Sequence, residues 1–374
     1  MQLEQLGWDT FFSSQFDAIR RDGLVPARIA EQHRNGYIVY AAQGEFAADV
    51  SGRFRHVLAG SDGYPTVGDW VSIQLPTGGA SATIHGLLQR RTRFVRKVPG
   101  GRTAAQVVAA NVDMVFLVNG LDQNFNLRRI ERYVTEAWGS GAQPVILLNK
   151  ADVCGDADTL VRAVASVTPG VAVHAMSAMR NEGMDVVRSY LAVGRTIAFV
   201  GSSGVGKSTI INLLLGEDHQ EVQAVSNAVG KGRHTTTSRS LLLCPGGGMI
   251  IDTPGMRELQ LWVDEDDVGQ SFVDIEMLAG KCRFRNCTHT TEPGCAVTAA
   301  IADGSLDEER YLSYRKQQSE VRRLQRFQEL REHTRGGDLS RVHGVRQIES
   351  RNHERPPERR RIDRVRSDES EEET

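Results

Sequence analysis

A glycine-rich segment near the middle of the chain has the residue types that hold phosphate groups. Residues 201–208 read Gly-Ser-Ser-Gly-Val-Gly-Lys-Ser and match the pattern G-x-x-x-x-G-K-[S/T]. In this pattern the glycines let the backbone wrap the phosphates, and the N-terminus of the following helix adds a positive dipole. Lys207 is expected to reach the β- and γ-phosphates, and the Ser208 hydroxyl to ligate Mg²⁺. An apolar run, Thr196–Val200, precedes the segment and a helical pattern, Lys207–Leu215, follows it, which is the context that a phosphate loop requires.

A second pattern selects the base. Asn149, Lys150 and Asp152 form N-K-x-D directly after the apolar run Pro144–Leu148. A carboxylate at Asp152 can accept from N1–H and the amino group of guanine, whereas adenine would leave it unpaired. The stem of Lys150 can lie along the base, and Asn149 can tie the loop to the base edge. Ser177-Ala178, after another buried run, matches the third base-contacting element, in which a backbone N–H reads guanine O6.

Two further segments have the composition of nucleotide-sensing switches. Asp252 begins a D-x-x-G pattern that ends at Gly255, so Asp252 would hold Mg²⁺ through water and the Gly255 N–H would sense the γ-phosphate. Between this pattern and the phosphate loop, residues 230–237 read Gly-Lys-Gly-Arg-His-Thr-Thr-Thr, and a threonine here can ligate Mg²⁺ when the loop orders over GTP. We favour Thr236 over its two threonine neighbours for that ligand.

The residue that orients the attacking water is not the usual one. Many small GTPases place a glutamine directly after D-x-x-G, and this chain has Met256 there. Intrinsic hydrolysis should therefore be slow, or another residue must act. His234 is the nearest candidate along the sequence, and the alternative is that it only orders the switch or contacts a partner.

A cysteine-rich segment predicts a metal site. Three of the five cysteines and one histidine fall within residues 282–295, and an odd, crowded set of this kind indicates metal rather than disulfides. Three thiolates and one imidazole suit a tetrahedral, structural Zn²⁺ with no open position. The expected ligands are Cys282, Cys287, His289 and Cys295. The two remaining cysteines, Cys154 and Cys244, are expected to be structural thiols.

Besides the metal cluster, the sequence predicts nucleotide contacts, catalytic residues and magnesium ligands. The expected nucleotide contacts are Asn149, Lys150, Asp152, Ser177, Ala178, Gly201, Ser202, Ser203, Gly204, Val205, Gly206, Lys207, Ser208 and Thr209. The expected catalytic residues are Lys207, His234 and Thr236, and the expected magnesium ligands are Ser208, Thr236 and Asp252.

Predicted strands and helices alternate along the part of the chain that contains these residues. From residue 111 onward, continuous apolar runs alternate with amphipathic helical patterns, which predicts a mainly parallel sheet covered on both faces. The expected strands are 112–118, 144–148, 171–176, 196–200 and 248–252, and the expected helices are 127–138, 156–167 and 207–215.

The flanking regions differ in character. Residues 1–24 are expected to be a polar, partly helical lead-in, and residues 25–98 contain five short strand-like runs that favour a small barrel, preferably of the five-stranded OB type. Residues 89–102 are basic without an acid, and are either a solvated linker or a phosphate-contacting patch. Residues 264–335 combine the cysteine cluster with a long helical pattern over 306–333, and the basic side chains around the cluster could meet RNA or form an ordinary solvated rim.

Composition limits the classes of function. Apolar residues make up 40% and charged residues 25% of the 374 positions, which is typical of a globular protein, and the net charge of −2 provides no global attraction to nucleic acid. No apolar run reaches the length of a membrane span, and the N-terminus has an early acid and no apolar signal core. We therefore expect a cytoplasmic monomer, with residues 336–374 as a disordered tail.

The order of the motifs is circularly permuted. The base-reading elements precede the phosphate loop and the switches, whereas ordinary GTPases have the reverse order. This order, the switch sequence Gly-Arg-His-Thr-Thr-Thr and the flanking regions resemble the RsgA (YjeQ) family over about residues 25–335. The resemblance implies an OB-fold domain, a permuted GTPase domain and a C-terminal zinc domain. It also favours His234 as a catalytic residue and implies binding of the small ribosomal subunit and its rRNA, with GTP hydrolysis stimulated by that subunit.

We accordingly expect five segments: a lead-in at 1–24, an OB-fold-like RNA-binding domain at 25–98, a permuted GTPase domain at 104–263, a helical zinc domain at 264–335 and the tail at 336–374. The expected function is late maturation of the small subunit by a GTPase with GTP, GDP and rRNA as partners. Two alternatives are a permuted GTPase of the large subunit and a non-enzymatic RNA-binding scaffold that keeps GTP as a structural ligand.

Overall fold

The computed structural model describes residues 1–19, 22–58, 63–76, 81–97, 105–216, 239–252 and 265–335. His234, Thr236, Gly255, Met256 and the tail at 336–374 lie outside these ranges. Contacts divide the chain into two compact units, Met1–Val321 and Arg322–Thr374. The helix α11 (Glu308–Arg335) begins in the first unit and ends in the second, and the other described elements lie in the first unit.

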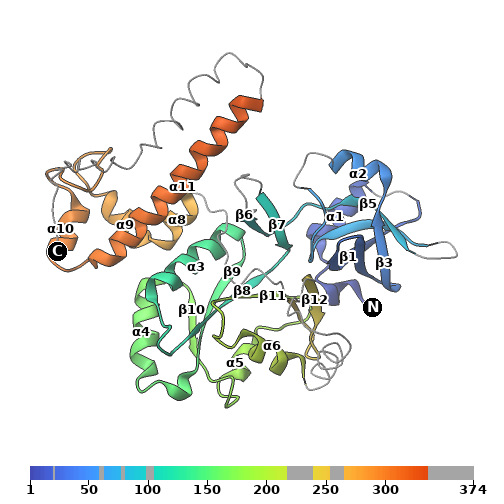
Figure 1. Ribbon diagram of the computed structural model, residues 1–374, viewed down its shortest axis with the longest axis horizontal. Helices are drawn as coiled ribbons and strands as arrows, with labels where there is room; N and C mark the ends of the chain where they lie inside the picture. The colour runs from blue at the N-terminus through green and yellow to red at the C-terminus, as the bar shows by residue number, and fades with distance from the viewer. Residues whose placement is uncertain are drawn as a thin grey trace, which may run out of the picture. The chain divides into compact units, whose positions relative to one another are not determined.

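A mainly parallel sheet forms the centre of the unit. Its order is β10-β9-β8-β11-β13-β12, in which β12 alone among these six runs antiparallel to its neighbour. The strands are β8 (Met114–Gly120), β9 (Gln143–Asn149), β10 (Ala172–Ala175), β11 (Thr196–Val200), β12 (Arg239–Leu243) and β13 (Met249–Asp252). The sequence predicted all of these except β12, and the prediction of a mainly parallel sheet is confirmed (Figure 1).

Helices cover both faces of this sheet. Alternate residues of β8 point to opposite sides: Val115 and Leu117 join the core under α3 (Leu127–Ser140) and α4 (Ala157–Val167). Phe116 and Val118 join the core under α5 (Met184–Ser189) and α6 (Lys207–Leu215). Because both sides of β8, β9 and β11 are buried, these strands are continuous apolar runs in the sequence.

The N-terminal strands close into a barrel. The order is β1-β2-β3-β5-β4, and β4 pairs back onto β1. Pairing is antiparallel except between β3 and β5, and apolar side chains from all five strands form a core inside the barrel. The elements are β1 (Leu24–His33), β2 (Gly36–Ala41), β3 (Gly44–Val50), α2 (Gly52–Leu58), β4 (Trp70–Gln74) and β5 (Ala82–Leu87). The five-stranded barrel of the OB type is confirmed.

A buried arginine joins the barrel to the central sheet. β1 pairs with β12 through Glu31↔Ser240, so the barrel and the central sheet share one hydrogen-bonded ladder. Arg28 on β1 is 1% exposed and donates to the carbonyls of Leu6, Gly68 and Asn111. Burial lowers the pKa of the Arg28 guanidinium to about 10, so it remains charged at neutral pH.

The N-terminal segment is more than a polar lead-in. The expected helical content is present as a 3-10 turn at Leu3–Leu6 and the helix α1 (Thr10–Ile19). These elements also carry three buried apolar side chains, Leu6, Phe12 and Phe16. The centroid of the Trp8 ring lies 4.7 Å from the centroid of the Trp70 ring on β4. The aromatic residues of this segment therefore join the core that continues under α3, and the polar composition of the segment did not predict this.

Part of the basic stretch at residues 89–102 forms a strand and ion pairs. Its described part contains β6 (Arg93–Lys97), which pairs with β7 (Ala105–Ala110) in a hairpin that the sequence did not predict. Arg90 makes a two-pronged ion pair with the fully buried Asp69, and Arg91 pairs with Asp9. Arg90 therefore stabilises the structure internally and is neither a solvated linker residue nor a free phosphate contact. The pair of Arg91 with Asp9 is exposed and contributes little to stability.

The C-terminal part of the unit is helical around a small core of its own. The helices are α8 (Glu265–Ser271), α9 (Val273–Ala279), α10 (Ala296–Ala302) and α11 (Glu308–Arg335), the last close to the expected 306–333. Among the described residues, no helix combines the length and the apolar composition needed to cross a bilayer.

Arg310 on α11 fastens this region to the central sheet. Its side chain is 4% exposed and lies 2.7 Å from the buried Glu131 carboxylate on α3. It also binds both carboxylate oxygens of Asp274 at 2.7 Å and donates to the carbonyls of Val167 and Ser271. Every side of the guanidinium is used, because a buried charge is tolerated only when it is paired and hydrogen-bonded.

Replacing Arg310 by methionine should lower the free energy of unfolding by about 3 kcal/mol, because it removes one partner of a buried ion pair. Urea unfolding followed by circular dichroism measures the change. The matched control is Arg188→Met, since the pair of Arg188 with Asp185 is exposed and should contribute less than about 1 kcal/mol. Equal effects of the two substitutions would contradict the role of Arg310.

Candidate functional site

The described residues of the predicted nucleotide site lie at one edge of the parallel sheet. The N-K-x-D loop follows β9, Ser177-Ala178 follows β10, the phosphate loop follows β11, and Asp252 is the last residue of β13. Because the carboxyl ends of parallel strands point the same way, these loops converge, and this edge is where open α/β sheets bind ligands.

Asn149 links three of these loops. Its side chain is 3% exposed; Nδ2 donates to the Val205 carbonyl in the phosphate loop at 2.8 Å. Oδ1 accepts from the Ala178 N–H at 2.9 Å. We expected Asn149 to tie its loop to the base edge, and its amide instead ties the base-reading loops to the phosphate loop. The Ala178 N–H could therefore donate to a guanine O6 only through a bifurcated hydrogen bond that Asn149 Oδ1 also accepts.

Glycine is required at two positions of the phosphate loop. A Cβ at Gly206, where φ is +102°, would lie 2.2 Å from Asn149 Nδ2. A Cβ at Gly201, where φ is +150°, would lie 2.2 Å from the Val118 carbonyl oxygen. Both the left-handed backbone and the close approach exclude any side chain here.

The polar groups of the phosphate loop differ in their exposure and partners. Lys207 begins α6, and its ammonium donates to the carbonyls of Gly201 and Ser202 at 2.6 Å each, which holds it within the loop. Ser208 and Thr209 are exposed on the first turn of α6. The hydroxyls and the helix N-terminus are thus available to an anion and its metal.

The carboxylate of Asp152 is oriented by a buried serine. Ser177 is fully buried, and its hydroxyl donates to Asp152 Oδ1 at 2.6 Å, which lowers the pKa of that carboxyl. The Ala151 N–H donates to the Met176 carbonyl at 3.0 Å, which joins the two loops a second time. Sequence reasoning used Ser177 only for its backbone, because a contact between residues so far apart in the chain leaves no local pattern.

Lys150 has a partner that the sequence did not reveal. Its ammonium lies 2.7 Å from Asp122 Oδ2, and Asp122 follows β8, the strand beside β9. The hydrogen bond from Lys150 holds the pKa of the Asp122 carboxyl below its usual range.

The four predicted metal ligands form one cluster. The ligand atoms of Cys282, Cys287, His289 and Cys295 all lie within 4.8 Å of one another. Cys282 Sγ lies 3.8 Å from Cys295 Sγ and 3.5 Å from His289 Nδ1, and His289 Nδ1 lies 3.4 Å from Cys295 Sγ. Such a set of soft donors can hold a metal ion.

The surroundings of the cluster fix its shape. Cys295 caps the N-terminus of α10, and although burial opposes ionisation, hydrogen bonds from Thr298 and His289 lower the pKa of its thiol to about 6. The Tyr311 hydroxyl of α11 donates to the His289 carbonyl at 2.7 Å. The basic residues beside the cluster, Lys281, Arg283 and Arg285, are exposed.

The remaining cysteines behave as expected of structural thiols. Burial raises the pKa of the Cys244 thiol to about 11, so it is unreactive at neutral pH. Cys154 is half-buried and packs against the core under α3 and α4.

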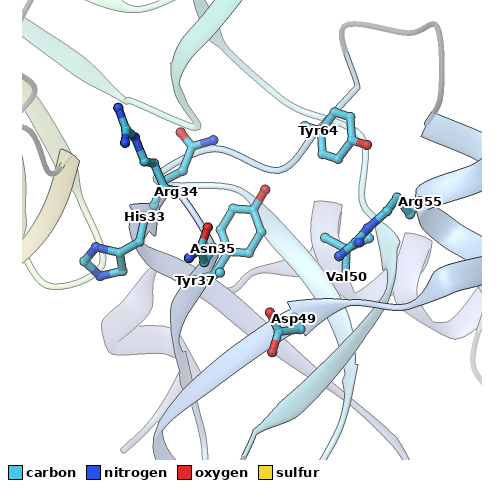
Figure 2. A pocket seen from close by; sticks show the side chains of 10 residues that line it. His33, Arg34, Asn35, Tyr37, Asp49, Val50, Arg55 and Tyr64 are labelled. Atoms are coloured by element: carbon cyan, nitrogen blue, oxygen red, sulfur yellow. The ribbon is translucent and has the colours of Figure 1, made fainter.

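A polar pocket opens on the barrel (Figure 2). Its walls come from the β1–β2 turn, from β3, from α2 and from the segment around Tyr64. The side chains include two tyrosines, Tyr37 and Tyr64, and two arginines, Arg34 and Arg55. Aromatic faces with basic groups are the usual means of binding single-stranded nucleic acid.

Comparisons with known proteins agree on one family. The family model described as RsgA GTPase matches residues 87–262. A small ribosomal subunit biogenesis GTPase RsgA of Opitutus terrae is 48% identical over 86% of this chain and 90% of its own length. One of the same description from Streptomyces coelicolor is 42% identical over 86% of this chain and 87% of its own length.

Solved structures agree as well. YjeQ of Thermotoga maritima matches with a TM-score of 0.60 and 26% identity, over 80% of this chain and 98% of that one. YloQ, described as a circularly permuted GTPase, matches with a TM-score of 0.56 and 25% identity, over 81% of this chain and 98% of that one.

Replacing Asn149 by alanine should weaken GDP binding at least about tenfold, because two buried hydrogen bonds between the loops are lost at about 1 kcal/mol each. Titration calorimetry measures the affinity. Asn35→Ala, an exposed position in the β1–β2 turn, is the control and should bind as the wild type does. An Asn149→Ala affinity within twofold of the wild type would contradict the bridging role.

Proposed function

We propose a function from one premise: this chain belongs to the RsgA family of small ribosomal subunit biogenesis GTPases. In this proposal, the sheet edge around Asn149 binds and hydrolyses GTP during subunit maturation. The observation that carries the proposal is the joining of the base-reading loops to the phosphate loop by one buried amide. This brings a guanine-selective carboxylate, Asp152, and a phosphate-binding ammonium, Lys207, to the same edge.

Each predicted contact has a proposed role. Asp152 accepts from guanine N1–H and the amino group, and the phosphate loop with Lys207 holds the β- and γ-phosphates. Ser208 and Asp252 hold Mg²⁺, together with Thr236 from the switch, and Mg²⁺ supplies charge neutralisation at the phosphates. Hydroxyl, carboxylate and water ligands are those that Mg²⁺ prefers, which supports this donor set.

His234 is proposed to orient the attacking water. The usual glutamine position holds Met256, whose thioether cannot direct a water. An imidazole can accept a proton or a hydrogen bond from water near neutral pH, which makes His234 the best-suited side chain in the switch sequence.

The partner surface is proposed to include the barrel. The pocket with Tyr37 and Tyr64 offers two aromatic faces beside Arg34 and Arg55, a combination suited to unpaired rRNA bases and their phosphates. We retain the proposed segments: 1–24, the RNA-binding barrel at 25–98, the GTPase domain at 104–263, the zinc domain at 264–335 and the tail at 336–374. The protein is proposed to act as a cytoplasmic monomer.

The metal is proposed to be one structural Zn²⁺. Bond lengths of about 2.3 Å to sulfur and about 2.0 Å to nitrogen place tetrahedral ligands about 3.8 Å (S to S) and about 3.5 Å (S to N) apart. The observed separations of 3.8, 3.5 and 3.4 Å match this geometry. Four protein ligands leave no open position, so the ion would hold the helices around it rather than take part in hydrolysis.

The purified protein should contain about one equivalent of zinc by elemental analysis after mild dialysis. Cys282→Ser should lower that content well below half, because the site loses one of its thiolates. Cys244→Ser lies outside the cluster and should retain the wild-type content. Less than half an equivalent in the wild type would contradict the zinc site.

GTP turnover should rise at least about tenfold when purified small ribosomal subunits are added, because a partner is needed to complete a site that lacks the glutamine. Phosphate release measures the rate. His234→Ala should lose at least about tenfold of the stimulated rate while retaining GDP affinity.

Four outcomes would contradict parts of this proposal. No stimulation by small subunits would contradict the role in their maturation, and stimulation by large subunits would favour the alternative partner. Unchanged stimulated turnover in His234→Ala would remove His234 from the mechanism. Binding of GTP without any turnover would favour a scaffold.

A further inference from the structure

The lysine of the base-reading loop is held in an unusual backbone conformation. Lys150 has φ of +67°, a left-handed value that costs a non-glycine residue free energy and persists where surrounding contacts enforce it. On either side, the Asn149 carbonyl accepts from the Leu121 N–H at 2.7 Å and the Ala151 N–H donates to the Met176 carbonyl. The side chain of Lys150 therefore leaves the loop in a set direction, toward the loop that follows β8.

The carboxylate of Asp122 pairs with the Lys150 ammonium in this loop. Its Oδ2 lies 2.7 Å from Lys150 Nζ, and its Oδ1 accepts from the Asn124 N–H at 3.0 Å. The Asp122 carbonyl accepts from the Phe125 N–H at 2.9 Å. At Gly120 a Cβ would lie 3.0 Å from Asp122 Oδ1, so the missing side chain leaves room for the carboxylate. The acceptor is thus fixed before it meets the lysine.

This ion pair is poorly suited to a role in stability. The side chains of Lys150 and Asp122 are 32% and 23% exposed, and ion pairs of this exposure contribute little to folding. The pair instead fixes both ends of the lysine, its Cα by the loop and its Nζ by the carboxylate. A long side chain with both ends fixed presents its methylene stem as a flat apolar edge.

We propose that Asp122 is a positioning residue that holds the stem of Lys150 in place as a preformed surface for the guanine ring. This rests on the proposed function, because the stem serves a base only if the edge binds guanine nucleotides. Without the carboxylate, Lys150 would have to be ordered at the moment of binding, and the lost rotamer freedom would weaken nucleotide retention.

A simpler role for Asp122 is to shape the turn before α3. Asp122→Asn separates the two roles, because asparagine keeps an oxygen for the Asn124 N–H and removes the charge that attracts Lys150. Lys150→Met keeps an apolar stem and removes the ammonium. If Asp122 acts through Lys150, the two substitutions together should cost no more than Lys150→Met alone.

The test is the dissociation rate of a fluorescent mant-GDP, measured by stopped flow for the wild type, Asp122→Asn, Lys150→Met and the double variant. Each single variant should release the nucleotide about three- to tenfold faster, and the double variant no faster than Lys150→Met. Asp158→Asn, exposed on the first turn of α4, is the charge-matched control and should release at the wild-type rate.

Two results would overturn the inference. One is an Asp122→Asn rate within a factor of 1.5 of the control (about the resolution of such a comparison). The other is a double variant in which the two single effects multiply, which would indicate a separate turn-shaping role. Failure of the wild type to bind mant-GDP would instead contradict the proposed function itself.

Discussion

The two hydrogen bonds of the buried Asn149 amide set the geometry on which the rest of the site depends. A buried amide without partners would cost free energy, and this one finds them only when the phosphate loop and the Ser177-Ala178 loop stand at a fixed separation. Gly206 must then lack a side chain, because the amide occupies the space where a Cβ would project. In the proposed function a nucleotide would span the same two loops, so this one side chain would set the distance between base and phosphate recognition.

The parallel sheet explains why permuted motifs still form one site. β8 pairs with both β9 and β11, although two helices and a further strand separate β9 from β11 in the chain. Pairing depends on position in the sheet and not on order in the sequence, so the loops meet whichever strand comes first. The permutation also leads the chain from β13 into the C-terminal helices, which Arg310 fastens to α3.

Local patterns in the sequence predicted the central sheet, the barrel strands and the motif positions. Buried parallel strands are continuous apolar runs, and the motifs lie at their ends, so both are visible locally. The β6–β7 hairpin was missed because β6 lies in a basic stretch without the apolar alternation of a strand, and Arg96 finds its partner, Gln106, only across the folded hairpin. The roles of Asp122 and the Ser177 hydroxyl were missed for the same reason: each depends on a side chain from another loop.

The central claim is that this edge is assembled to read guanine. Titration calorimetry with GDP and with ADP tests it most directly, because the two ligands share the phosphates and ribose and differ in the base that Asp152 meets. The account predicts that GDP binds at least about a hundredfold more tightly, since adenine lacks the adjacent N1–H and amino donors that guanine would offer to the Asp152 carboxylate. Equal affinities would show that the loops joined by Asn149 do not form a guanine site.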